Sequence, residues 1–269
     1  MATFLQAATA CITCCKKEWY VLEPLSWQHA NHCVSHSNQQ TKAILAVAKR
    51  QKTGHAAHIA MAVSEDHHSF EASGQLPMSI ECLEWFTARK ISPQTLVRNH
   101  ITERQVCMSS KQPDKELAIV FPSIYKGKII GLKYRTLARR WSQSKQFQSI
   151  LYGMDDIDGE STVIIVEGEM DKLSLKEAGF TNVVSVPNGA PDKVKNGPLP
   201  EHSADKAFEY VWNCWEKLQQ ASCILLGTDN DLPGHALAEE LARRLGCRRR
   251  SAEALTSLPQ RQQQRKSAA

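Results

Sequence analysis

The chain has 269 residues, a hydrophobic fraction of 42% and a formal net charge of +5. This length is enough for one or two domains with a substantial core, and the modest charge permits nucleic-acid binding without requiring it. No stretch approaches the apolar length that spans a bilayer, so no membrane partner is expected. Nine cysteines in a chain this long do not form a disulfide framework and favour a reducing compartment.

The first 75 residues carry the weakest structural signal. Their polar, His-rich and Gln-rich composition predicts loops, little core and partial disorder. Residues 1–10 have no acidic side chain and several small or hydroxyl ones, as transit peptides do, although the arginine of such peptides is missing. This stretch alone leaves open whether the protein is imported into an organelle or is otherwise soluble and intracellular.

Two pairs of potential metal ligands lie in the same segment, Cys11 with Cys14 and Cys33 with His36. Their separation is near that of zinc ribbons. Against a zinc site, Cys15 adjoins Cys14, and no Gly-rich knuckle surrounds either pair. Chance pairs are also common in a segment rich in Cys and His, so zinc is not expected as a cofactor.

Residues 76–142 are expected to form a small basic α+β domain. Apolar residues recur at helical spacings over 79–106. Within that range, Ser92 followed by Pro93 is typical of a helix start, with Ser92 as the cap.

A β-hairpin is predicted in the second half of this domain. The apolar run 117–122, a turn at 126–128 and the run 129–135 give its two strands. Lys133 and Arg135 alternate on the second strand and therefore face the same side. Two more arginines follow it, Arg139 and Arg140. This basic face indicates contact with nucleotide phosphates or a template backbone, and the alternative is a solvated edge strand protected by its charge.

Residues 143–160 are polar and acidic, with turns marked by Gly153 and Gly159. They are expected to link the basic domain to the one that follows. Asp155 and Asp156 are either additional metal ligands or part of a solvated loop, and we favour the loop.

A strand, a helix and a second strand are predicted next. The β-branched run Val163–Val166 suits a strand buried on both faces, and it stops at Glu167. The elements that follow are a helix over Asp171–Ala178 with Gly179 as its C-cap and a strand over Val183–Val186. Because open α/β sheets carry their sites at the carboxyl ends of parallel strands, Glu167 is a candidate site residue. Asn188 and Gly189 follow the second strand end, where glycine lets backbone approach a ligand closely.

A later apolar strand ends in a second group of acids, Asp229 and Asp231. These two residues point the same way in extended backbone because they are two positions apart. Pro233 marks the start of a helix whose amphipathic part runs over Ala236–Leu245. The segment between the two acidic ends predicts a helix over 204–218, whose Trp212 and Trp215 are assigned to the core rather than to base stacking.

Three carboxylates from two strand ends of one parallel sheet are expected to converge, namely Glu167, Asp229 and Asp231. Hard oxygen ligands without a neighbouring Cys or His predict Mg²⁺ or Mn²⁺ rather than zinc. Such a site suits phosphoryl transfer.

These motifs resemble a known family. Glu-Gly at the end of one strand and Asp-x-Asp-x-Pro-Gly at the end of a later one look like the Toprim domain of bacterial-type primases, topoisomerases and some nucleases. More specifically, the chain resembles the primase half of Twinkle, the phage-type organellar primase–helicase, above all in its plant versions. The stretches that carry the resemblance are Leu151–Ile157, Val166–Ser174, Val184–Pro191 and Thr228–Gly234.

The resemblance implies an α/β fold with a Toprim domain over 161–247, in which a central, mainly parallel sheet is flanked by helices. It also implies primer synthesis on a single-stranded DNA template, in which a 3′-hydroxyl attacks the α-phosphate of a nucleoside triphosphate. The metal ligands and catalytic residues would be Glu167, Asp229 and Asp231, and the nucleotide or template contacts would be Lys133, Arg135, Asn188 and Gly189. A separate helicase or polymerase would be a partner, and the location would be a mitochondrion or chloroplast.

The chain departs from the family at two points. After Cys247 the residues 248–269 are basic and show no strand pattern, which predicts a disordered tail and a missing sheet strand. No Gly-x4-Gly-Lys-Ser/Thr phosphate loop occurs in the sequence, so an ATP-driven helicase unit is not expected. Two alternatives therefore stay open: a catalytically weak or inactive Toprim nucleic-acid-binding protein, and a nuclease or topoisomerase fragment. A topoisomerase also needs a catalytic Tyr, whereas Tyr210 lies on a predicted core helix.

Overall fold

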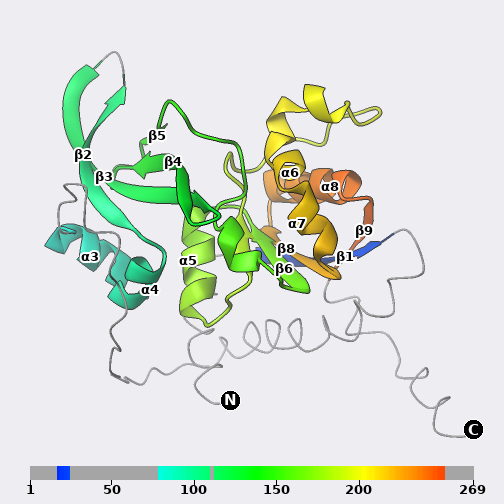
Figure 1. Ribbon diagram of the computed structural model, residues 1–269, viewed down its shortest axis with the longest axis horizontal. Coiled ribbons are helices and arrows are strands. Elements are labelled where there is room, and N and C mark those ends of the chain that lie inside the picture. Colours follow the sequence, from blue (N-terminus) through cyan, green and yellow to red (C-terminus); the bar gives the residue numbers. More distant parts are fainter. Residues whose placement is uncertain (1–16, 25–77, 110–111, 252–269) are drawn as a thin grey trace, which may run out of the picture.

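The structure is a computed structural model that describes residues 17–24, 78–109 and 112–251. Two sheets organise it (Figure 1): a five-stranded sheet with strand order β7-β6-β8-β1-β9 and a four-stranded sheet with strand order β2-β3-β4-β5. Helix α5 lies between the two sheets and contacts α4, so the parts of the molecule pack directly on each other.

The four-stranded sheet is built from strands that follow one another in the chain, after two short helices. The elements are α3 (Ile80–Thr87), α4 (Pro93–Arg98), β2 (Thr102–Ser109), β3 (Gln112–Tyr125), β4 (Lys128–Arg135) and β5 (Trp141–Gln143). Ser92 caps α4 by accepting a hydrogen bond from the backbone N–H of Thr95, as its sequence predicts. The predicted hairpin is confirmed, with Lys126 (φ 52°) and Gly127 (φ 70°) forming the turn between β3 and β4.

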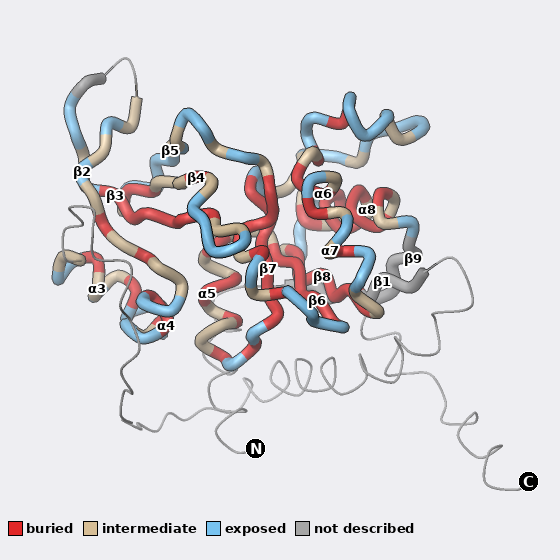
Figure 2. The backbone as a smooth tube through the Cα atoms, in the orientation of Figure 1, coloured by how far each residue is buried: buried red, intermediate tan, exposed pale blue. Residues whose placement is uncertain are grey.

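The five-stranded sheet contains the predicted parallel strands. They are β6 (Thr162–Val166), β7 (Val183–Ser185) and β8 (Cys223–Asp229), and the helices that follow β6 and β8 are α5 (Glu169–Glu177) and α8 (Leu232–Arg244). Every residue of β6 and β7 is buried, as expected for strands covered on both faces (Figure 2). Gly179 (φ 90°) follows the C-cap of α5, and Pro233 lies in the first turn of α8. The predicted α/β fold is therefore confirmed.

Two strands that the sequence does not predict complete this sheet. β1 (Lys17–Pro24) pairs antiparallel with β8, and β9 (Cys247–Ser251) pairs antiparallel with β1. The prediction of a missing strand is therefore wrong. The prediction of little core before residue 76 is also wrong at Tyr20, which is buried in the core of this sheet. The partners of β1 lie at the opposite end of the chain, so no local pattern reveals the pairing.

The segment predicted as a linker, 143–160, packs into the structure. Leu151 and Met154 are buried in the core, and Tyr152 exchanges backbone hydrogen bonds with Ser185 of β7. The 3₁₀ helix η1 (Met154–Ile157) follows.

The two aspartates of η1 make specific contacts instead of belonging to a solvated loop. The carboxylate of Asp155 accepts hydrogen bonds from the backbone N–H groups of Lys126 at 2.8 Å and Gly127 at 2.9 Å, which form the hairpin turn. Asp156 forms ion pairs with Lys172 and Lys176 of α5. Asp155 thus holds the hairpin, and Asp156 holds α5.

The single helix predicted over 204–218 is broken. Its pieces are η2 (His202–Ala204), η3 (Lys206–Phe208), α6 (Glu209–Asn213) and α7 (Trp215–Gln220). Cys214, at φ −104° and ψ 5°, separates α6 from α7. Between η2 and η3, the carboxylate of Asp205 accepts a hydrogen bond from Arg244 of α8, a tertiary contact that overrides the local helical pattern there. Trp212 and Trp215 pack against the core, as predicted.

Some predictions fall outside the described ranges. They concern the candidate zinc ligands Cys11, Cys14, Cys33 and His36, the transit-like residues 1–10, and the tail beyond residue 251. In the part of the chain that the structure describes, no helix has the length and apolar character needed to cross a membrane.

Candidate active site

The two acidic strand ends predicted from the sequence lie next to each other. β6 and β8 are neighbouring parallel strands in which Val166 is opposite Gly227. Just beyond this pair, Oε1 of Glu167 accepts a hydrogen bond from the backbone N–H of Asp229 at 2.7 Å. Both residues are partly exposed, so a ligand at this edge of the sheet has access to them.

The third predicted acid has a local structural role as well. Asp231 is the N-cap of α8, and its Oδ1 accepts a hydrogen bond from the backbone N–H of Gly234 at 2.8 Å. Gly234 packs so tightly that a Cβ there would lie 2.0 Å from the carbonyl oxygen of Asp229. The motif Asp-x-Asp-x-Pro-Gly therefore fixes the turn from β8 into α8 and the position of the Asp231 carboxylate.

The donor chemistry of these acids fits a hard divalent cation. Glu167, Asp229 and Asp231 offer carboxylate oxygens, the ligands that Mg²⁺ and Mn²⁺ prefer. The described residues hold no group of three His, Cys, Asp or Glu side chains arranged to bind a metal ion. Mg²⁺ does not require such a group, because it usually takes only one or two carboxylates together with water and substrate phosphates.

Lys133 of β4 reaches this edge from the other sheet. Its Nζ donates hydrogen bonds to Oε1 of Glu169 at 2.7 Å and to the carbonyl oxygen of Pro187 at 2.6 Å. Glu169 is the first residue of α5, and Pro187 follows β7. Lys133 thus ties the basic sheet to two segments beside the acidic strand ends, and β4 lies between β3 and β5. The alternative of a solvated edge strand is wrong.

Arg135 faces the same side of β4 but is buried among aromatic rings. Its Cζ lies 4.6 Å from the ring centroid of Trp85 and 5.6 Å from that of Trp141. Burial, with the nearby charges of Arg89 and Arg139, lowers the pKa of Arg135. Lys133 and Arg135 therefore both contact Trp141, and Lys133 also binds Glu169 of α5 and Pro187 after β7.

Asn188 and Gly189 follow β7 and are exposed. Gly189 has φ 71°, and no atom lies within 4 Å of the position its Cβ would take. This backbone conformation favours glycine, and the open space leaves room for a ligand. The contact of Lys133 with the preceding residue, Pro187, places this loop beside the basic sheet.

One buried charge near the site was not predicted from the sequence. Lys172 of α5 donates from Nζ to Asn99 at 2.7 Å and pairs with Asp156 at 2.7 Å. Burial lowers its pKa to about 8, although the charge of Asp156 opposes this shift. Gly153 leaves room for the Lys172 side chain, because a Cβ on residue 153 would lie 2.1 Å from Cε of Lys172. A single lysine within a helix gives no sequence signal for such a role.

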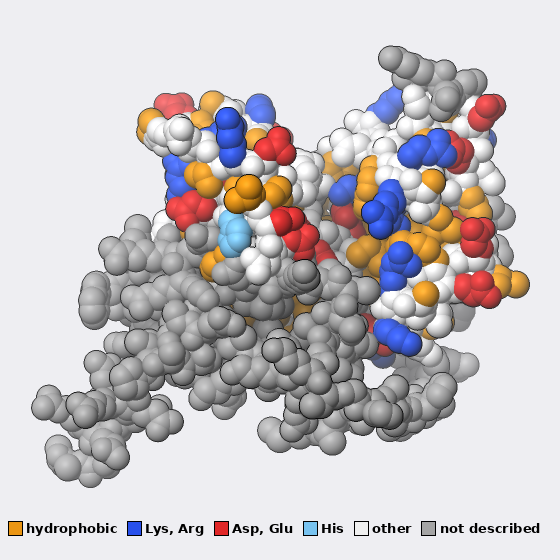
Figure 3. Space-filling model, turned by 180° about the vertical axis from the view of Figure 1, so that it is seen from behind, with side chains coloured by type: hydrophobic (Ala, Val, Ile, Leu, Met, Phe, Trp, Pro, Cys, Tyr) orange, Lys and Arg blue, Asp and Glu red, His pale blue; other side chains and the backbone are white. Residues whose placement is uncertain are grey.

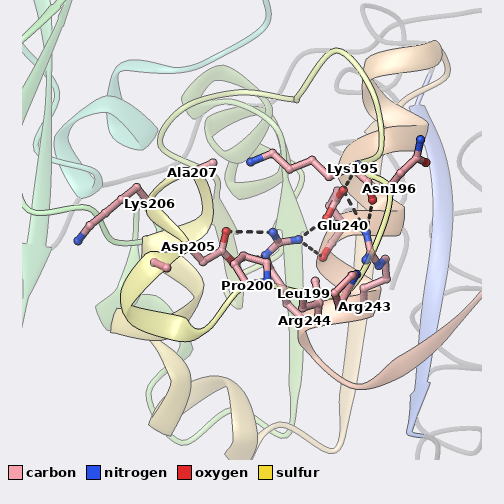
Figure 4. Close-up of a pocket in the computed structure, with 12 residues that line it drawn as sticks. Lys195, Asn196, Leu199, Pro200, Asp205, Lys206, Ala207, Glu240, Arg243 and Arg244 are labelled. Atoms are coloured by element: carbon pink, nitrogen blue, oxygen red, sulfur yellow. Dashed lines mark hydrogen bonds and ion pairs between the residues drawn. The ribbon is translucent and has the colours of Figure 1, made fainter.

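A second polar cluster lies away from the strand ends, between α8 and residues 195–207 (Figure 4). Buried Arg244 bridges Asp205, at 2.6 Å from Nε to Oδ2, and the fully buried Glu240. A cavity of about 480 Å³ adjoins this triad, and none of the predicted site residues lines it. Although burial opposes it, hydrogen bonds from Arg244 and Trp212 hold the pKa of Asp205 below its usual value. The ion triad therefore anchors this segment to α8.

Comparison with known proteins agrees with this architecture. Residues 161–252 match the Toprim domain family. The Primase homolog protein of Arabidopsis thaliana is 47% identical over 170 residues, which are 63% of this chain and 48% of that protein. The Twinkle homolog protein, chloroplastic/mitochondrial, of the same plant is 44% identical over 170 residues, which are 63% of this chain and 23% of that protein.

The chain thus spans about half the length of one relative and about a quarter of the other. The crystal structure of the primase fragment of the bacteriophage T7 primase–helicase protein is 21% identical, with a TM-score of 0.47 over 73% of this chain and 71% of that one. The chain therefore carries a Toprim domain and is related to the plant primase-homolog and Twinkle-homolog proteins.

Proposed function

We propose that this protein is a primase-type nucleotidyltransferase that makes short primers on single-stranded DNA from nucleoside triphosphates. The observation that carries the proposal is the contact between Glu167 and Asp229 at the ends of two neighbouring parallel strands. The name of the 47% identical relative, a primase homolog, supports it.

Glu167, Asp229 and Asp231 would hold Mg²⁺ or Mn²⁺ in this reaction. A bound divalent ion stabilises the negative charge that develops on the phosphoryl oxygens during transfer. The protein contributes preorganisation, because the hydrogen bond from Asp229 fixes the carboxylate of Glu167 and the helix cap fixes that of Asp231. Glu167 is then placed to orient the attacking 3′-hydroxyl or to accept its proton.

The nucleotide and template would lie beside the acidic strand ends, where Lys133 joins the four-stranded sheet to α5 and the segment after β7. Lys133 and Arg135 provide positive charge from the four-stranded sheet, and Asn188 and Gly189 provide an exposed loop on the other side. Seen from behind, Lys and Arg side chains lie among hydrophobic ones over the part that carries the four-stranded sheet (Figure 3). Such a mixture suits a strand with charged phosphates and flat bases.

We further propose a separate helicase or polymerase as partner and a chloroplast or mitochondrion as location. The second proposal is supported by the name of the Twinkle homolog, which includes both organelles. Import of the tagged full-length protein into isolated plant organelles tests it, and exclusion from both organelles would contradict it.

The activity is tested by incorporation of labelled nucleotides on single-stranded DNA with Mg²⁺. We expect incorporation by the wild type and loss of at least 100-fold in Asp229→Asn. Asp114→Asn is the matched control, because Asp114 is an exposed residue of β3 in the other sheet. A folded wild type that binds DNA but incorporates nothing, with Mg²⁺ or Mn²⁺, would instead support the catalytically inactive nucleic-acid-binding protein.

A further inference from the structure

Trp141 is an unusually placed aromatic residue. It begins the short strand β5 and is 44% exposed, although its ring carries a large apolar surface. Nζ of Lys133 lies 4.7 Å from its ring centroid, and Cζ of Arg135 lies 5.6 Å from it. The indole therefore combines an exposed aromatic surface with two cations beside its ring, a pairing that suits a base and its phosphate.

Of the two cations beside Trp141, Lys133 is paired with Glu169, whereas Arg135 has a nitrogen without a hydrogen-bond partner among the described residues. Arg135 is only 8% exposed, and its Nη1 is buried with no hydrogen-bond partner among the described residues. Arg89, stacked 3.6 Å from the centroid of Trp85, and Arg139 act on Arg135 as like charges. The nearby acid, Glu169, is already paired with Lys133. A buried guanidinium nitrogen without a partner calls for an acceptor that arrives with a ligand.

We propose that Trp141 is a base-stacking platform for single-stranded nucleic acid, flanked by Arg135 and Arg139 as phosphate contacts. This proposal rests on the proposed function, and it adds Trp141 and Arg139 to the predicted template contacts Lys133 and Arg135. An aromatic face for the base and guanidinium groups for the phosphates are the two elements of sequence-independent single-strand binding. Duplex DNA, whose bases are stacked inside, does not fit this pairing.

The contacts of Lys133 connect Trp141 to the acidic strand ends. Lys133 touches both Trp141 and, through Glu169 and Pro187, the segments beside the strand ends. Lys133 is therefore a positioning residue that fixes the distance between the stacked base and the site. Arg135 and Arg139 carry the phosphate contacts.

The test measures fluorescence anisotropy of a labelled single-stranded oligothymidylate with the full chain. Trp141→Leu is expected to bind about ten-fold more weakly, the usual size of one lost base–aromatic contact, and Trp141→Phe to keep most of the affinity. Ile129→Ala is the matched control, because Ile129 of β4 is also 44% exposed and is not aromatic. It is expected to bind like the wild type. Circular dichroism verifies that each variant is folded.

Two further arms separate stacking from charge. An abasic oligonucleotide with the same number of phosphates is expected to bind wild type and Trp141→Leu equally. Arg139→Ala should reduce the slope of log affinity against log salt by about 0.7, the value for one phosphate contact on a single strand. Trp141→Leu should leave that slope unchanged.

Equal binding of oligothymidylate by wild type and Trp141→Leu, or the same loss with the abasic strand, would overturn the platform. If the wild type still incorporates nucleotides in that case, the proposed function stands and only the stacking role of Trp141 is wrong. A wild type that binds no single strand and incorporates no nucleotide would overturn both.

Discussion

At the scale of single residues, the site depends on two glycines for different reasons. Gly234 has no space for a side chain, because a Cβ would collide with the backbone of Asp229. Gly189 has open space around it but φ 71°, which other residues adopt only with strain. The sequence motifs point to both glycines. Only the structure shows that Gly234 is required by tight packing and Gly189 by its backbone conformation.

Gly234→Ala should therefore cost more stability than Gly189→Ala. We expect the free energy of unfolding to fall by roughly 2–3 kcal/mol for Gly234→Ala, because overpacking displaces the backbone of Asp229. Gly189→Ala should cost about 1 kcal/mol through strain alone. Urea denaturation followed by circular dichroism measures both, and the reverse order would contradict the packing described.

Burial lowers the pKa of Lys172 and so changes the pH range in which this side chain is charged. Its pKa of about 8 in the folded protein lies below its ordinary value of 10.5. Between these values the unfolded chain binds a proton on Lys172 that the folded chain does not. Raising the pH through this window therefore favours the folded state.

Comparison with Lys172→Met isolates this effect. Relative to the variant, the wild type should gain roughly 2–3 kcal/mol of unfolding free energy between pH 8 and 10.5. Below about pH 8 the difference should be constant. Urea denaturation of both proteins across this range measures it, and a difference that does not change with pH would show that Lys172 titrates as in water.

At the scale of elements, local sequence patterns predict some helices and strands, and long-range contacts determine the others. The runs of β6 and β8, the glycine after α5 and the hairpin turn are short-range signals, and these elements were predictable. β1 was not, because its hydrogen bonds go to β8 and β9 near the other end of the chain. The breaks in the segment 204–218 were not predictable either; at Asp205, between η2 and η3, the carboxylate binds Arg244 and Trp212, and these contacts leave no pattern in the sequence.

The ion triad of Arg244, Asp205 and Glu240 is expected to anchor residues 195–207 to α8. Arg244→Met leaves the buried carboxylates of Asp205 and Glu240 without their cation, and should lower the free energy of unfolding by about 3–5 kcal/mol. Arg243→Met, on the same helix, removes a more exposed guanidinium that binds backbone carbonyl oxygens of Lys195 and Gly197 and pairs with Glu240 only at 3.4 Å. It should cost about 1 kcal/mol. Equal losses in chemical denaturation would mean that the triad does not anchor the segment.

At the scale of the whole molecule, the candidate site is assembled from both sheets. The sequence placed acids at the ends of two strands of one sheet, and in the structure the carboxylate of Glu167 accepts a hydrogen bond from the backbone N–H of Asp229. It did not predict that Lys133 would bind Glu169 and Pro187, because the packing of one sheet on another leaves no periodic pattern. It also assigned Asp155 and Asp156 to a loop, whereas they hold the hairpin and α5.

The most direct measurement is the initial rate of template-dependent nucleotide incorporation in a double-mutant cycle of Glu167→Gln and Asp229→Asn. If the two acids act as one unit, each single variant should lose at least 100-fold, and the double variant should lose little more than either. Retained incorporation in both single variants, or losses that simply multiply, would contradict a site in which the side chains of Glu167 and Asp229 act together.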